Sequence, residues 1–227
     1  MKLLSLVAGI LVASSFSLSA QTPLTDEQVS ASIRAGGDKK QLNAFMAECV
    51  ASPGFGENLG KSFAAGLSRT AVTDTGTYKV TFTSHYGQIA MAAAERQRRY
   101  QPAPTPADII EELRLPRLHL WIEPQGDSAV GDGTIDLAAV IEHIVIRAED
   151  RPQQSAQPLS VKSEPVDFKN LLGAQFTANR AFATFEMESA LTLAKERDLE
   201  VVVITKSGER RCNVGKDRIR RMFDAPK

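Results

Sequence analysis

Three side chains in the middle of the chain are of types that bind transition metals. His119 and Glu123 lie on one face of a run with strand-like alternation, and His143 lies on the next strong run. Imidazole and carboxylate groups form several transition-metal sites, and they would converge here if the two strands pair. The alternative is a histidine packed beside Trp121. Because the spacing is loose and no group that would orient the ligands can be named, we predict no cofactor and keep His119, Glu123 and His143 as metal candidates.

A glycine-rich run from residue 54 to residue 62 has the composition of a phosphate-binding loop but not its spacing. A Walker motif requires glycine five residues before Gly60, where Phe55 stands. The dinucleotide fingerprint requires glycine where Leu59 stands. The run also follows no predicted strand, so the sequence argues against a nucleotide site.

Three aspartates, Asp127, Asp132 and Asp136, are spread among glycines ahead of residue 140. An EF-hand loop has acidic residues at alternating positions and ends in glutamate, and this segment has neither feature. Aspartate and glycine are also the residues that ordinary turns select. We expect a turn, with calcium binding as the alternative.

Signatures of hydrolytic catalysis are missing from the sequence. The chain has neither a G-x-S-x-G elbow nor an H-E-x-x-H helix. His85 follows Ser84 directly, but a catalytic serine–histidine pair is defined by geometry and not by adjacency. The sequence therefore leans against an enzyme and leaves the question open.

Charge is balanced over the chain, with 27 basic and 27 acidic residues. This balance gives no bulk attraction to nucleic acid, whose binding needs a broad positive field. The C-terminal segment is locally basic and contains Lys206, Arg210, Arg211, Lys216, Arg218, Arg220 and Arg221. We expect a solvated helix face there, over a buried side formed by Ile219, Met222 and Phe223; an anion-binding patch is the alternative.

Cys49 and Cys212 are the only cysteines of the chain. In an oxidising compartment an even pair is a candidate disulfide. Closing a loop of that length stabilises a fold by about 4–5 kcal/mol in the chain-entropy model. The alternative is two separately buried thiols, because the sequence does not give the distance between them.

The cysteine argument depends on the compartment, which the first residues indicate. Residues 1–20 have the parts of a secretory signal peptide: Lys2, an apolar run over residues 3–12, and small residues leading to cleavage after Ser19 or Ala20. The apolar run is shorter than the about 20 residues of a membrane-spanning helix. We predict a periplasmic or secreted mature chain without a transmembrane segment.

The elements that position these residues begin with a helical segment. Thr25 and Gln28 have the spacing of a capping box, and Gly36 and Gly37 end that helix. Apolar residues at three- and four-residue steps predict a second helix over residues 38–51. Residues 52–76 read as a loop, so residues 21–76 form a helical N-terminal segment and loop.

Residues 77–227 are predicted to form a β-rich domain with helical insertions. Alternation and apolar runs predict strands at 77–83, 118–123, 140–147, 158–162, 182–187, 199–205 and 210–214, the fourth at an edge and the sixth at the centre. Helices are predicted at 88–100, 105–113, 189–197 and 216–223. The order favours an α+β fold, an antiparallel sheet or sandwich-like domain with inserted helices, preceded by a short helical segment.

The function that this reading favours is a non-catalytic binding or scaffolding module of the cell envelope. Its partner is unknown and is expected to be another envelope protein rather than nucleic acid. The alternatives are an envelope or extracellular hydrolase whose site is assembled from distant residues, and an inhibitor or accessory subunit of another exported protein.

Overall fold

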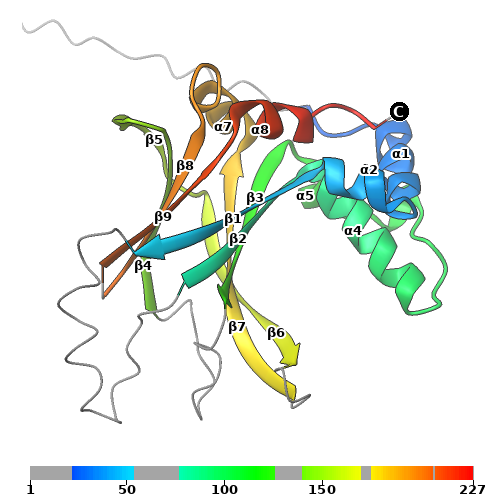
Figure 1. Cartoon of the computed structure of the whole chain (residues 1–227). Helices are drawn as coiled ribbons and strands as arrows, with labels where there is room; N and C mark the ends of the chain where they lie inside the picture. Colours follow the sequence, from blue (N-terminus) through cyan, green and yellow to red (C-terminus); the bar gives the residue numbers. More distant parts are fainter. Residues whose placement is uncertain (1–21, 54–76, 126–139, 170–174, 207, 227) are drawn as a thin grey trace, which may run out of the picture.

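A computed structural model describes residues 22–53, 77–125, 140–169, 175–206 and 208–226. In these ranges, nine strands form one antiparallel sheet in the order β5-β4-β8-β9-β1-β2-β3-β7-β6 (Figure 1). The strands are β1 (Met46–Pro53), β2 (Thr77–Ser84), β3 (Arg117–Gln125), β4 (Ile141–Ala148), β5 (Arg151–Ala156), β6 (Ser160–Lys169), β7 (Gln175–Glu186), β8 (Leu199–Thr205) and β9 (Gly208–Val214). The helices are α1 (Asp26–Gly36), α2 (Lys39–Ala44), α4 (His85–Arg98), η1 (Pro106–Asp108), α5 (Glu111–Arg114), α7 (Met187–Leu193) and α8 (Lys216–Met222).

The sheet has two halves that meet where β9 lies beside β1. The five-strand half contains β1, β2, β3, β7 and β6, and the four-strand half contains β5, β4, β8 and β9. Figure 1 shows the halves curling toward each other, and their inner faces share one core with α7 and α8. The α+β, antiparallel prediction is confirmed. The shape is a half-barrel rather than a sandwich, because the halves join edge to edge through β1 and β9 instead of stacking as separate sheets.

Alternation along each strand decides which side chains enter this core. In β2, Tyr78, Val80 and Phe82 face inward and are at most 2% exposed. The predicted central strand is confirmed in β8, where Val201, Val202 and Val203 are all buried. Each large side chain removed from water in this way contributes about 1.5–3 kcal/mol to the hydrophobic stabilisation.

A second, helical layer lies beside the sheet, at the right of Figure 1, and contains α1, α2, α4 and α5. Its first helix begins at the predicted capping box: the Gln28 N–H donates to Thr25 Oγ1 at 3.3 Å, and the Thr25 N–H donates to Gln28 Oε1 at 3.0 Å. Helix α4 begins three residues earlier than predicted, because Ser84 Oγ accepts the Gly87 N–H and caps it. None of the helices in the described ranges is long and apolar enough to cross a membrane.

The predicted helix over residues 38–51 is wrong in its second half. Helix α2 ends at Ala44, and the chain continues as strand β1. Val50, which the helical spacing assigns to the buried face, is 46% exposed. Pairing of β1 with six residues of β2, together with the bridge at Cys49, overrides the local periodicity.

Helices α1 and α4 approach closely at Gly36. A Cβ atom at this position would lie 2.3 Å from the Ala90 carbonyl oxygen and 3.0 Å from the Ala93 Cβ. Because the closer contact is with backbone, the helices would have to move apart to relieve it.

We expect Gly36→Ala to lower the free energy of unfolding by about 1–3 kcal/mol, measured by urea denaturation. Gly37→Ala is the matched control, because a Cβ there would meet nothing closer than 3.4 Å and the φ of −77° suits alanine. Equal stability of the two variants would contradict the close packing of α1 on α4.

Candidate functional site: the seam between β1 and β9

The two halves of the sheet are joined by a short seam between β1 and β9. In the described part of the chain, strand pairing across it is limited to Ser52–Arg211 and Pro53–Arg210. Beyond these pairs the strands separate around a cavity of about 530 Å³, which we call the seam cleft. Its lining residues are Asn43, Met46, Ala47, Glu48, Asn213, Val214, Gly215 and Arg218.

A disulfide closes the narrow end of the seam cleft. Cys49 and Cys212 are bridged with their Cα atoms 5.8 Å apart, which confirms the predicted pair. In β1, Cys49 lies between the cleft residue Glu48 and the paired residue Ser52. The covalent link therefore stands where hydrogen-bonded pairing between the halves stops.

The backbone of β1 presents hydrogen-bonding groups to the seam cleft at every second residue. The Phe45 carbonyl accepts a hydrogen bond from the end of β2 at 3.2 Å. The next carbonyl, that of Met46, accepts from Arg218 Nε at 2.9 Å, on the cleft side. Because successive residues of a strand direct their backbone groups to opposite edges, the cleft residue Glu48 also directs its N–H and C=O toward the cleft. Such an edge can pair with another extended chain.

The lining of the seam cleft is mostly polar. The Glu48 carboxylate pairs with Lys79 Nζ at 2.8 Å, and the Arg218 guanidinium donates to two backbone carbonyls at the α2–β1 junction. Two small buried side chains, Ala47 and Val214, form the floor. Backbone groups over a small apolar floor suit recognition of a main chain rather than of a large apolar ligand.

The outer edges of the sheet are less suited to pairing. Strand β6 is at one edge, as predicted, and β5, which the sequence reading missed, is at the other. They contain Pro165 and Pro152, and proline removes a backbone donor from an edge. Strand β1 has no proline between Met46 and Ser52, so the seam offers the more open strand edge.

The structure separates the three predicted metal candidates. His119 and Glu123 share the outer face of β3, whereas the exposed His143 lies on β4 in the other half. Four strands lie between β3 and β4 in the sheet order, so the pairing on which a three-residue site depended does not occur. In the described ranges, no group of three His, Cys, Asp or Glu side chains is arranged to hold a metal ion.

His119 is packed among neighbours on its own sheet. It is 5% exposed, its ring stacks on Phe182 at a centroid distance of 5.3 Å, and its Nδ1 lies 3.3 Å from Thr184 Oγ1. Burial, with smaller contributions from His85 and Arg117, lowers the pKa of His119 to about 4. The ring is therefore neutral near neutral pH.

Glu123 is engaged by an arginine. Arg180 NH1 lies 3.1 Å from Glu123 Oε1, and Arg180 NH2 lies 3.1 Å from Glu164 Oε2. The same guanidinium lies over the Trp121 ring, 4.4 Å from its centroid. Glu123 therefore forms an ion pair within a half-buried cluster, and this ion pair explains the presence of a charged residue on the outer face of β3.

The basic residues near the C-terminus serve the fold in several cases. Arg210 is buried, and Arg218 and Arg220 donate to backbone carbonyls of other elements. The predicted apolar side of α8 is confirmed by the complete burial of Ile219 and Met222. These arginines therefore act partly as internal hydrogen-bond donors rather than as a free basic surface.

A second cavity, of about 770 Å³, lies between α7, the N-terminal segment and the start of α4; we call it the α7 groove. Its lining is mainly apolar and includes Leu24, Tyr86, Leu191 and Phe223. His85 forms part of the inner wall of the groove and is 3% exposed. Burial lowers the pKa of His85 to about 4, against a smaller opposing effect of a hydrogen bond to the Arg117 backbone.

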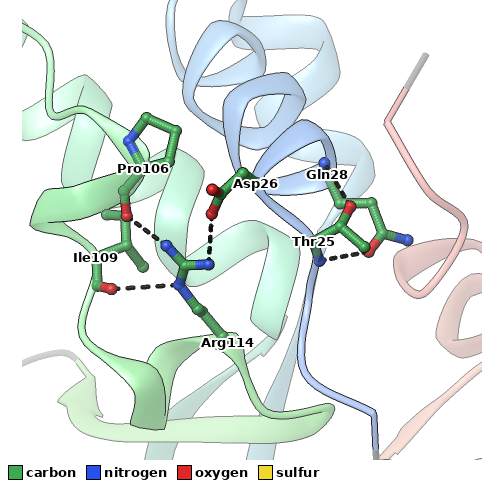
Figure 2. Close-up of polar contacts among 6 residues, drawn as sticks. All are labelled: Thr25, Asp26, Gln28, Pro106, Ile109 and Arg114. Atoms are coloured by element: carbon green, nitrogen blue, oxygen red, sulfur yellow. Dashed lines mark hydrogen bonds and ion pairs between the residues drawn. The ribbon is translucent and has the colours of Figure 1, made fainter.

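Arg114 holds the N-terminal segment that forms one side of the α7 groove (Figure 2). Its NH1 pairs with Asp26 Oδ1 at 2.7 Å, at the start of α1. The remaining guanidinium nitrogens donate to the carbonyls of Ile109, at 3.3 Å, and Pro106. The Arg114 carbonyl in turn accepts the Leu24 N–H at 2.9 Å. These contacts hold the N-terminal segment, which includes the groove residues Leu24 and Thr25, against η1 and α5.

Four sequence interpretations lie wholly or mostly outside the described residues. They are the signal peptide over residues 1–20, the glycine-rich run over residues 54–62, the turn containing Asp127, Asp132 and Asp136, and the predicted loop over residues 52–76, of which the two described residues, 52 and 53, belong to β1.

Sequence reasoning missed the seam cleft because its two walls are far apart in the chain and one of them was predicted to be helical. One signal could have found it. Cys49 was predicted to bridge Cys212, and Cys212 lies in a run predicted as a strand. A disulfide to a strand residue requires the partner segment to lie within about 7 Å of it, as a neighbouring strand does.

Comparisons with protein-family models, with curated proteins and with solved structures find no match for this chain, so its functional interpretation rests on the geometry described above.

Proposed function

We propose that this protein is an exported, non-catalytic binding module of the cell envelope that takes an extended segment of another exported protein into the seam cleft. The observation that carries the proposal is the open edge of β1. There, two neighbouring strands of one sheet stop pairing, and the alternation along β1 directs the backbone groups of Glu48 into a cavity. Strand addition is a recurring mode of peptide recognition, in which main-chain hydrogen bonds supply affinity.

Two features of the chain support the export part of the proposal. Residues 1–20 have the pattern of a signal peptide. The disulfide at the narrow end of the seam cleft is a bond that persists in oxidising compartments such as the periplasm and the extracellular space.

The expected binding mode follows from the lining of the cleft. An inserted strand alternates its side chains between two faces, so every second residue of the partner meets the floor formed by Ala47 and Val214. The intervening residues meet the outer side, where Glu48 and Lys79 form their ion pair. The site therefore favours small or apolar residues at alternating positions and obtains most of its affinity from the backbone.

Random seven-residue peptides displayed on phage and selected on the oxidised protein supply the probe. We expect the best synthetic peptide to bind at least about tenfold more weakly when three alternate amides are N-methylated, since each lost hydrogen bond costs about 0.5–1.5 kcal/mol. A peptide that lies between β1 and β9 uses the amides along both of its edges, so methylation of either alternate set of amides should weaken binding. Isothermal titration calorimetry measures these affinities, and peptides that bind equally well with and without methylation would overturn the proposal.

A protein variant tests the same contact from the other side. Glu48→Pro removes a backbone N–H that points to the cleft and leaves the pairing of β1 with β2 in place. Glu48→Ala is the matched control, because it removes the same side chain and keeps the N–H. We expect loss of peptide binding in the first variant and retention in the second; equal affinity for both would contradict strand addition at β1.

A further inference from the structure

We propose that the α7 groove binds a short apolar peptide with free termini, about three residues long. This site is separate from the seam cleft and independent of the function proposed for it. One continuous face of α7 and its C-terminal extension forms a wall of the groove, because the lining residues Glu188, Leu191, Thr192 and Lys195 recur at three- and four-residue steps.

The two ends of this wall have opposite charges. Glu188 and Lys195 are exposed, line the groove, and form no ion pair with another described residue. Lys195 lies in the turn that continues α7, where the Ala194 N–H donates to the Ala190 carbonyl and the Lys195 N–H to the Thr192 carbonyl. At the helical rise of about 1.5 Å for each residue, the seven steps from Glu188 to Lys195 correspond to about 10 Å along the axis. An extended tripeptide places its ammonium and carboxylate about the same distance apart. The charges therefore match a peptide whose amino terminus lies at Glu188 and whose carboxyl terminus lies at Lys195.

The lining of the groove is mainly apolar, and its uncharged polar members are Thr22, Thr25, Gln28 and Thr192. Leu24, Tyr86, Leu191 and Phe223 line the groove, and His85 behind them is buried and neutral near neutral pH, so it adds no competing charge. Apolar side chains of a bound peptide gain about 25 cal/mol for each Å² that they bury here. The ligand class is thus an apolar peptide rather than a charged one.

Isothermal titration calorimetry of the oxidised protein with Ala-Leu-Leu tests the assignment. We expect N-acetylation and C-amidation each to weaken binding by up to about fivefold, the range for exposed charge pairs. In Glu188→Gln the effect of acetylation should disappear, and in Lys195→Met the effect of amidation should disappear. Glu196→Gln and Lys40→Met change the net charge equally at exposed positions that do not line the groove, and they should bind as the parent protein does.

Several outcomes would overturn the assignment. One is equal affinity for the free and capped peptides, and another is no binding at millimolar concentration. Tighter binding of decanoate that depends on Lys195 alone would assign the groove to an acyl chain. Tighter binding of a peptide with the sequence of residues 3–12 would assign it to the chain's own leader. A dimer that the tripeptide dissociates would assign it to a second copy of the protein.

Discussion

Replacing both bridged cysteines, in Cys49→Ala/Cys212→Ala, is expected to lower the free energy of unfolding by about 4–5 kcal/mol. The bridge spans 163 residues of sequence, and the entropy that a cross-link removes from the unfolded chain grows with the length of the closed loop. In the described ranges, strand pairing across the seam is limited to two residue pairs, so little other backbone pairing there compensates. Because whole domains are stable by about 5–15 kcal/mol, this loss is a large fraction of the total.

Urea unfolding of the oxidised protein, the reduced protein and the double alanine variant measures the effect. The reduced protein is the matched control, because it keeps both sulfur atoms in the core and loses only the bond. We expect both altered forms to unfold at lower urea concentration by similar amounts. A reduced protein as stable as the oxidised one would show that the seam does not depend on the bridge.

Acidification is expected to destabilise the fold well before most carboxylates titrate. Burial lowers the pKa of His85 and of His119 from 6.5 to about 4 in the folded protein. The unfolded chain therefore binds protons first as the pH falls. The part of the free energy of unfolding that depends on these two neutral histidines is fully present above pH 6.5 and is lost as the pH falls from there through 4. The loss is about 2 kcal/mol for each histidine between pH 7 and pH 5.

Two measurements check this dependence. Urea denaturation at pH 7, 6 and 5 should show a decrease of about 4 kcal/mol in the free energy of unfolding for the two histidines together. NMR of the histidine ring protons should show both buried imidazoles still neutral in the folded protein at pH 5. Titration of either ring near pH 6.5 in the folded state would contradict the burial assigned to it.

Local signals predicted much of the fold. The capping box at Thr25, the alternating runs around Val80 and Leu120, and the doubly buried strand at residues 199–205 all reflect interactions within a few residues or a simple burial pattern. These interactions do not depend on which strands become neighbours, so they can be inferred without knowing the topology.

The arrangement of the strands could not be predicted in the same way. Pairing β3 with β4 was the condition for a site containing His119 and His143, yet β3 pairs with β2 and β7. The helical spacing over residues 38–51 concealed β1, whose extended form depends on partners far along the chain. Contacts between distant segments decide both the seam and the candidate site, and no short-range pattern records them.

The central claim is that β1 pairs fully on one side and is open to the seam cleft on the other. Residue-resolved amide hydrogen exchange tests it directly. We predict slow exchange at Ala47 and Cys49, whose N–H groups face β2, and fast exchange at Glu48, whose N–H group becomes protected when a selected peptide binds. Uniformly slow exchange along β1 in the free protein would mean that the seam is closed, and would contradict the account.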